Sequence, residues 1–146
     1  MHIGEICKID VPTVAKGTSV REAAQLMEEN CVGNVVVVED CENKSNPCGI
    51  LTDRDIVLNV VAKDKDLEMS VEEVMSKDLL IIKKEFGLQE TIEKLQEKAV
   101  RRAPIIDENN KVIGMATLDD ILPLLAKEMY CVAELITSQL QQPDKH

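Results

Sequence analysis

Aromatic side chains are almost absent from this chain of 146 residues, which has one tyrosine, Tyr130, one phenylalanine, Phe86, and no tryptophan. Its hydrophobic residues, 45% of the total, suffice for a buried core, but that core must be aliphatic. Proteins that bind single-stranded nucleic acid without sequence preference stack successive bases on aromatic rings. We therefore expect no such surface here.

Positive charge is also scarce, because 17 Lys and Arg residues face 27 Asp and Glu residues, for a formal net charge of −10. Phosphates attract basic surfaces, so nucleic acids and anionic membranes are disfavoured as partners. No apolar run approaches the roughly 20 residues that cross a bilayer. Residues 1–10 mix charged and apolar groups and lack the apolar core of a signal peptide. We expect a cytoplasmic protein.

Groups that perform catalysis or bind metals are few. The two histidines, His2 and His146, lie at opposite ends of the chain, and the five cysteines form no C-x-x-C pair. A zinc site is therefore poorly supported, and an odd number of thiols fits a reducing compartment. The sequence has no P-loop and no Ser/His/Asp or Cys/His set. We predict neither a metal site nor an enzymatic activity.

One stretch of eight residues occurs twice, at Gly49–Ile56 and at Gly114–Ile121, with Gly, Thr, Asp and Ile at matching positions 65 residues apart. It is typical of a strand that ends in a polar turn and leads directly into a helix. Thr52 is a good N-cap residue for that helix, and acidic residues in the first turn suit its dipole. Upstream, residues 3–39 correspond to 71–107 at an offset of 68. The chain is therefore a tandem repeat.

Each copy is predicted to fold as βαββα. The first copy has predicted strands at 11–14, 35–38 and 48–51, helices at 20–30 and 53–62, and a polar loop at 40–47. The second has predicted strands at 79–82, 104–106 and 112–116 and helices at 89–98 and from 118 to about 140, with Pro123 in or near the first turn of the last helix. The uninterrupted valine run 35–38 is typical of a strand buried on both faces.

Two small copies with so few aromatics could hardly close separate cores, so we expect one α+β module. In it, two βαββα repeats pack with pseudo-two-fold symmetry, with sheets inside and helices outside. We predict the first repeat at 1–62, a linker at 63–70 and the second repeat at 71–126. A helical extension and tail follow at 127–146.

A duplicated G-h-x-T-x-x-D-I phrase inside a duplicated βαββα frame resembles a tandem pair of CBS domains, or Bateman module. Val74–Met75, Glu22–Ala24 and Arg101–Asp107 also fit that family, and the resemblance covers residues 3 to about 125. It implies that an adenine nucleotide or relative binds between the repeats, with AMP, ADP, ATP and S-adenosylmethionine as candidates and no cofactor required. The motif Asp would accept bonds from the ribose hydroxyls, and the motif Thr would contact ribose or phosphate.

The resemblance places the candidate ligand-binding residues in two clefts, each joining the Thr and Asp of one repeat to the lead-in and second strand of the other. The first cleft comprises Thr52, Arg54, Asp55, Met75, Asp78, Leu79, Leu80, Val100, Arg101 and Arg102. The second comprises Thr117, Asp120, Cys7, Asp10, Val11, Pro12, Val32, Gly33 and Asn34.

The two clefts are not expected to be equivalent. Arg54, Arg101 and Arg102 give the first cleft cations that a phosphate needs, whereas Leu118 and Asp119 replace them in the second. We therefore predict that the first cleft binds phosphate better. The bland alternatives are that the threonines are only helix caps, the aspartates solvated acids and the arginines a surface pair.

The resemblance predicts a non-catalytic regulatory module that senses an adenosyl ligand and passes its occupancy to an effector protein. The alternative is a protein-interaction or assembly module with vestigial, ligand-free clefts. We expect a homodimer, because CBS pairs commonly dimerise through their helices. Apolar residues of the last helix would add contact: Leu124, Leu125, Tyr130, Leu135 and Ile136. The sequence leaves the identity of the ligand open.

Overall fold

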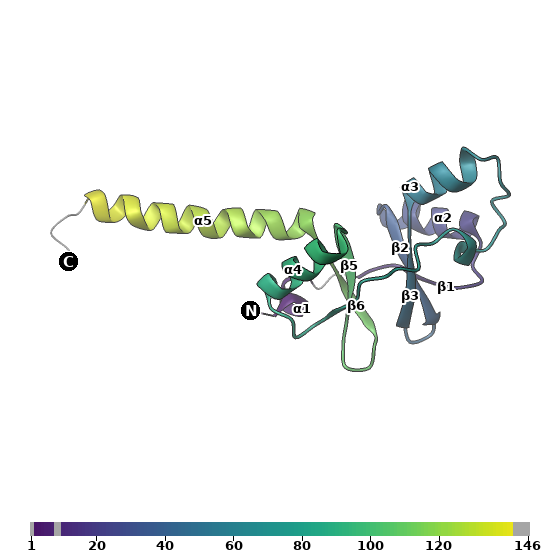
Figure 1. Cartoon of the computed structure of the whole chain (residues 1–146), viewed down its shortest axis with the longest axis horizontal. Helices are drawn as coiled ribbons and strands as arrows, with labels where there is room; N and C mark the ends of the chain where they lie inside the picture. The colour runs from purple at the N-terminus through teal and green to yellow at the C-terminus, as the bar shows by residue number, and fades with distance from the viewer. Residues whose placement is uncertain (1, 8–9, 142–146) are drawn as a thin grey trace. The chain divides into compact units, whose positions relative to one another are not determined.

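Two three-stranded sheets, one from each repeat, form the framework of the computed structural model (Figure 1), which describes residues 2–7 and 10–141. The chain divides into a unit at 1–116 and a second unit at 117–146, and each is described by itself. The elements of the first repeat are α1 (Ile3–Ile6), β1 (Thr13–Ala15), α2 (Val20–Asn30), β2 (Asn34–Asp40), β3 (Ser45–Thr52), α3 (Asp53–Ile56) and the π-helical turn η1 (Val57–Val61). Those that follow are the 3-10 turn η2 (Val71–Glu73), β4 (Ile82–Lys83), α4 (Leu88–Lys98), β5 (Arg102–Ile106), β6 (Val112–Thr117) and α5 (Leu118–Gln141).

The duplication extends to strand pairing. The first sheet has the order β1-β2-β3 and the second the order β4-β5-β6. In both sheets the first strand runs parallel to the central one, with Val14 opposite Val37 and Ile82 opposite Ile105. These two pairs are related by the offset of 68 residues that the sequence shows, so the register is shared by both repeats.

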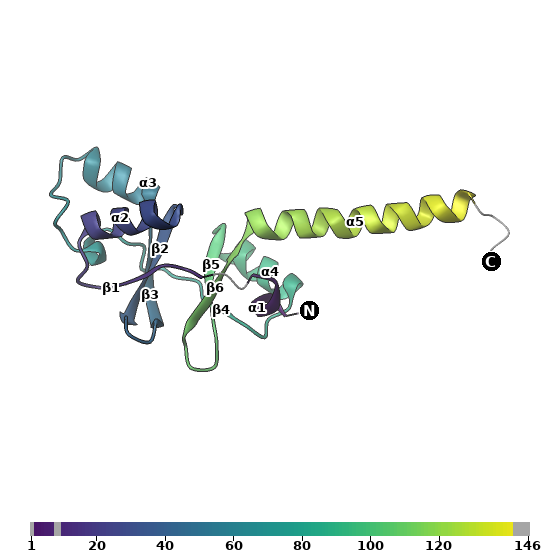
Figure 2. The same ribbon diagram turned by 180° about the vertical axis from the view of Figure 1, so that it is seen from behind.

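The valine run of β2 is buried on both faces, as predicted. Val35 and Val37 belong to a core cluster that includes Val20 and Met27 of α2. The alternate residues of β2, such as Val36, belong to a second cluster that includes residues of β5 and β6. Because side chains alternate along a strand, β2 separates the two cores. The sheets face each other, and α2 and α3 lie on the outer side of the first sheet (Figures 1 and 2).

The two repeats exchange their lead-in segments. The amide of Ile3 in α1 donates to the carbonyl of Phe86 in the second repeat, at 2.8 Å. Reciprocally, the amide of Val71 in η2 donates to the carbonyl of Thr18 in the first repeat, at 2.9 Å. Ile3 and Val71 are both fully buried. Each repeat therefore completes its core with a segment that belongs to the other.

The predicted loop at 40–47 is wrong, because β3 begins at Ser45 and only residues 41–44 connect it to β2. The reason is that this hairpin pairs with its counterpart in the second repeat. The amide of Asn46 donates to the carbonyl of Asn110 at 2.9 Å, and the amide of Val112 donates to the carbonyl of Lys44 at 2.9 Å. Such pairing between repeats leaves no mark in local composition.

The outer strands are shorter or shifted relative to the prediction. β1 begins after Pro12, whose carbonyl accepts the Val36 amide at 3.0 Å; proline itself has no amide to donate. Val11 instead turns into the core between the sheets. β4 covers only Ile82–Lys83 rather than 79–82, and residues 79–81 are half-buried outside the ladder.

Helices α2 and α4 confirm the predicted spans, apart from one extra residue at the start of α4. Ser19 caps α2, since its Oγ accepts the Glu22 amide at 3.1 Å. The predicted helix at 53–62 is α3 continued by a π-helical turn, in which the Ala62 amide donates to the Val57 carbonyl at 2.8 Å. In α5, Pro123 lies five residues after Leu118, beyond the first turn rather than in it.

Candidate functional site

The first candidate corner is the junction of β3 and α3, where Thr52 and Asp55 bond each other reciprocally. Thr52 Oγ1 accepts the Asp55 amide at 3.1 Å, and Asp55 Oδ2 accepts the Thr52 amide at 3.0 Å. This capping box fixes both side chains at the start of the helix. Both residues are half-buried, and Arg54 between them is exposed. The corner therefore presents a fixed hydroxyl and a fixed carboxylate beside a mobile cation.

The start of β2 lies at the same corner. Asn34 is the pairing partner of Thr52, and the Gly33 carbonyl accepts the Asp53 amide at 2.9 Å. A Cβ at Gly33 would lie 3.0 Å from Asp53 Oδ2, so this position has little room for a side chain. The prediction assigned Gly33 and Asn34 to the cleft of Thr117 alone, and this grouping is wrong. Antiparallel pairing of β2 with β3 places them beside Thr52.

The lead-in of the second repeat also reaches this strand. The amide of Ile50 donates to the Ser76 carbonyl at 3.2 Å, and the Ser76 amide donates back to the Ile50 carbonyl at 3.0 Å. Met75 is buried against Gly49, where an added Cβ would lie 2.9 Å from Met75 Cγ. The structure thus places Met75 on the strand that ends at Thr52, as the predicted first cleft requires. Ser76, absent from the prediction, is brought there by the same pairing.

The remaining members of the predicted first cleft surround the start of β5. Asp78 is exposed and forms an ion pair with Lys98, a cation that the sequence reasoning missed. Val100 follows α4, and its amide donates to the Leu95 carbonyl at 3.1 Å. The others occupy two short segments: Leu79 and Leu80 before β4, and Arg101 and Arg102 at the entry to β5. The offset of 68 maps Gly33 and Asn34 onto these arginines, so by analogy they belong beside Thr117.

The second candidate corner, at the start of α5, is bonded differently. Thr117 Oγ1 accepts the Asp120 amide at 3.1 Å, as in the first copy. Here, however, the Thr117 hydroxyl also donates to Asp120 Oδ2 at 3.0 Å. Asp120 is exposed, whereas Asp55 is half-buried. A ligand at the second corner would therefore compete with a bond between the two side chains that should recognise it.

The other residues predicted for the second cleft lie along the first repeat. Cys7 and Val11 are buried. Asp10 is exposed and pairs with Lys44 at 3.4 Å. Pro12 precedes β1, as described above, and Val32 is exposed between α2 and β2.

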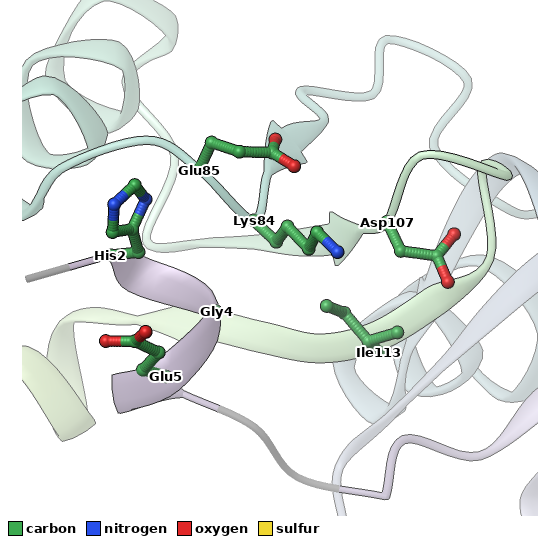
Figure 3. Close-up of a pocket in the computed structure, with 7 residues that line it drawn as sticks. All are labelled: His2, Gly4, Glu5, Lys84, Glu85, Asp107 and Ile113. Atoms are coloured by element: carbon green, nitrogen blue, oxygen red, sulfur yellow. The ribbon is translucent and has the colours of Figure 1, made fainter.

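A cavity of about 500 Å³ lies away from all of these residues, against α1 and the second sheet (Figure 3). Its lining is mostly charged or polar: His2, Gly4, Glu5, Lys84, Glu85, Asp107 and Ile113. Lys84 forms an ion pair with Glu108, and this hydrogen bond raises the pKa of the Lys84 ammonium. None of the lining residues was predicted to bind a ligand. Among residues 2–7 and 10–141, no group of three or more His, Cys, Asp or Glu is arranged to hold a metal ion.

The family model of the CBS domain matches residues 3–62 and again 71–127. The chain belongs to the CBS domain family. It is 37% identical to the CBS domain-containing protein YhcV of Bacillus subtilis over 111 residues, which is 76% of each chain. It is 34% identical over 136 residues to a protein of Methanopyrus kandleri, covering 92% of this chain and 66% of the relative.

Solved CBS structures have the same fold. A conserved protein from Pyrococcus horikoshii is 30% identical, with a TM-score of 0.70 over 84% of this chain and 90% of that one. A CBS domain pair solved in complex with 5-methylthioadenosine and S-adenosyl-L-methionine has a TM-score of 0.73 over 88% of this chain and 98% of its own, at 21% identity. The latter likeness establishes the fold alone.

Other relatives are larger proteins. This CBS pair is 33% identical to part of the homoserine O-acetyltransferase of Methanosalsum zhilinae, but it spans only 23% of that enzyme. The activity of such a relative is therefore not carried to this chain by the match. Within the described part of the chain, no helix is both long and apolar enough to cross a membrane.

Proposed function

We propose that this CBS pair is a non-catalytic regulatory module that binds an adenosyl ligand at the Thr52/Asp55 corner and, more weakly, at the Thr117/Asp120 corner. The observation that carries the proposal is the first corner itself. A hydroxyl and a carboxylate are held side by side at the end of β3, next to Gly33, Asn34 and the exchanged lead-in. The CBS pair complexed with methylthioadenosine and S-adenosylmethionine supports an adenosyl ligand for this fold.

The chemistry of the corner suits a ribose. A carboxylate accepts hydrogen bonds from both hydroxyls of a cis-diol, and Asp55 has lone pairs beyond the one that holds the Thr52 amide. Thr52 Oγ1 accepts one bond from the Asp55 amide and keeps its proton for a ligand oxygen. At the second corner the Thr117 proton is already donated to Asp120. This difference favours the first corner for binding.

The charged part of the ligand is assigned by cations. Arg54 is exposed beside Thr52, so it is available to a phosphate or carboxylate at the first corner. We now place Arg101 and Arg102 with Thr117, because β5 and β6 are neighbours and repeat the arrangement of β2 and β3. A phosphate-rich ligand such as ATP would then gain at the second corner what a ribose loses there. AMP, ADP, ATP and S-adenosylmethionine all remain candidates.

We further propose that the module acts as a homodimer on an effector protein and without a required cofactor. A ligand would change its output only by binding two arrangements with different affinity. A cytoplasmic location is supported by five free cysteines. Solved relatives include a hexameric CBS-CP12 protein, so assembly through this fold has a precedent at 28% identity.

Isothermal titration calorimetry with AMP, ADP, ATP and S-adenosylmethionine tests the proposal. Asp55→Asn keeps an acceptor for the Thr52 amide but loses the charge, so the fold is preserved while binding should weaken roughly 10- to 100-fold. Asp120→Asn should weaken binding less. Asp53→Asn is the matched control, since it removes the same charge one residue from Thr52.

Unchanged affinity in both Asp55→Asn and Asp120→Asn would contradict the assigned corners. Absence of heat with every ligand, in folded protein freed of copurified nucleotide, would favour the alternative of an assembly module with vestigial clefts.

A further inference from the structure

Helix α5 carries a straight apolar seam along its length. Its 24 residues extend over about 36 Å. Apolar side chains recur at alternating intervals of four and three residues: Leu118, Leu122, Leu125, Met129, Val132 and Ile136. Most of this seam is open to solvent, with 69% of Leu122, 74% of Met129, 58% of Val132 and 54% of Ile136 exposed. Such exposure is costly for a helix with no partner.

The middle of the seam is hollowed into a groove of about 560 Å³. Seam residues Leu125, Met129, Val132 and Ile136 line it with Ala133, and Glu128 at its edge is its charged member. No charged residue occupies a seam position. Ala126 and Ala133 flank the seam on one side, and small residues there let a second backbone approach closely.

The spacing identifies what fits this seam. An apolar repeat with a mean of 3.5 residues makes two helices coil around each other with side chains interlocked. A helix packed against a sheet or a globular surface follows a 3.6-residue period and shows a broader apolar stripe. The seams of two copies would together remove on the order of 1,000 Å² from water, which meets the lower limit for a stable protein interface.

We propose that α5 is a self-association helix whose seam, Leu118 to Ile136, pairs with the same seam of a second copy of this chain. This assigns a surface to the homodimer proposed above, and it rests on that part of the proposed function but not on ligand binding. Lys127 is the only cation in the sequence from Leu118 to Gln141, against four acids. That balance opposes the main alternative, an amphipathic helix lying on an anionic membrane.

Sedimentation velocity of the full chain across a concentration series tests the pairing. The wild type should dimerise, and Met129→Glu/Ile136→Glu should weaken dimerisation roughly 100-fold, because it buries charge at two seam positions. The matched control is Thr137→Glu/Ser138→Glu, which adds the same charge to the same turn but off the seam and should dimerise like the wild type. Met129→Ala/Ile136→Ala, which favours helix and adds no charge, should weaken dimerisation about tenfold.

Far-UV circular dichroism confirms that each variant retains its helix, and calorimetry with the adenosyl ligands is read separately. A wild type that stays monomeric at high concentration would overturn the pairing. So would seam variants that dimerise like the wild type, since any dimer would then use another surface. Neither result would alter the conclusion on ligand binding.

Discussion

Gly49 in β3 shows how one residue joins the two repeats. It is buried against Met75, and its φ angle is ordinary, so the position needs glycine for space rather than for conformational freedom. Gly49→Ala would press a methyl group against the Met75 side chain and should destabilise the fold by about 1–3 kcal/mol. The cost should largely disappear in a Met75→Ala background, where the methyl group has room. Urea unfolding followed by circular dichroism measures both values.

The control for this cycle is the Met75→Ala protein alone, which has its own cavity cost. Costs that simply add in the double variant would contradict a direct contact between the two positions.

At the scale of residues, the sequence predicted groups that act locally and missed those that depend on strand pairing. Thr52 as an N-cap follows from its own chemistry, and the structure confirms it. The location of Gly33 and Asn34 beside Thr52 depends on the register of β2 against β3, which no spacing in the sequence reveals. The assignment of Asp55 and Asp120 to a ligand stays a prediction.

At the scale of elements, the helices were predicted more accurately than the strands. α2 has a side-chain cap and an apolar face with helical spacing, both visible in the sequence. β4 has two residues and depends on its neighbour for its bounds. β3 begins earlier than predicted because the hairpins of the two repeats bond each other. The domain boundaries proposed at residues 62 and 71 stay a prediction.

The start of α3 should depend on the hydroxyl of Thr52 rather than on the rest of its side chain. Thr52→Ala leaves the Asp55 amide without its acceptor and should cost about 1 kcal/mol of unfolding free energy. Thr52→Ser keeps the acceptor and should stay close to the wild type, which makes it the matched control. Equal stability of the two variants in urea unfolding would show that the cap contributes nothing measurable.

At the scale of the whole chain, the offset of 68 residues predicted two equivalent repeats but not the exchange of their lead-ins. Exchange and self-packing give the same local sequence, because a buried Ile3 or Val71 meets an equivalent surface either way. The structure decides between them through the bonds from Ile3 to Phe86 and from Val71 to Thr18. Neither repeat can therefore keep its full core when the other unfolds.

This exchange predicts that residues 3–116 unfold as one cooperative unit. Ile3→Ala removes a fully buried side chain that packs on the second repeat and should cost about 2–5 kcal/mol. Native-state hydrogen exchange should then show the same loss of protection in the slowest amides of β2 and of β5, although Ile3 contacts only one of the repeats directly. Glu5→Ala, exposed on the same short helix, should change protection by no more than about 0.5 kcal/mol. A loss confined to β4, β5 and β6 would mean that each repeat is stable alone and that the exchanged lead-ins do not couple them.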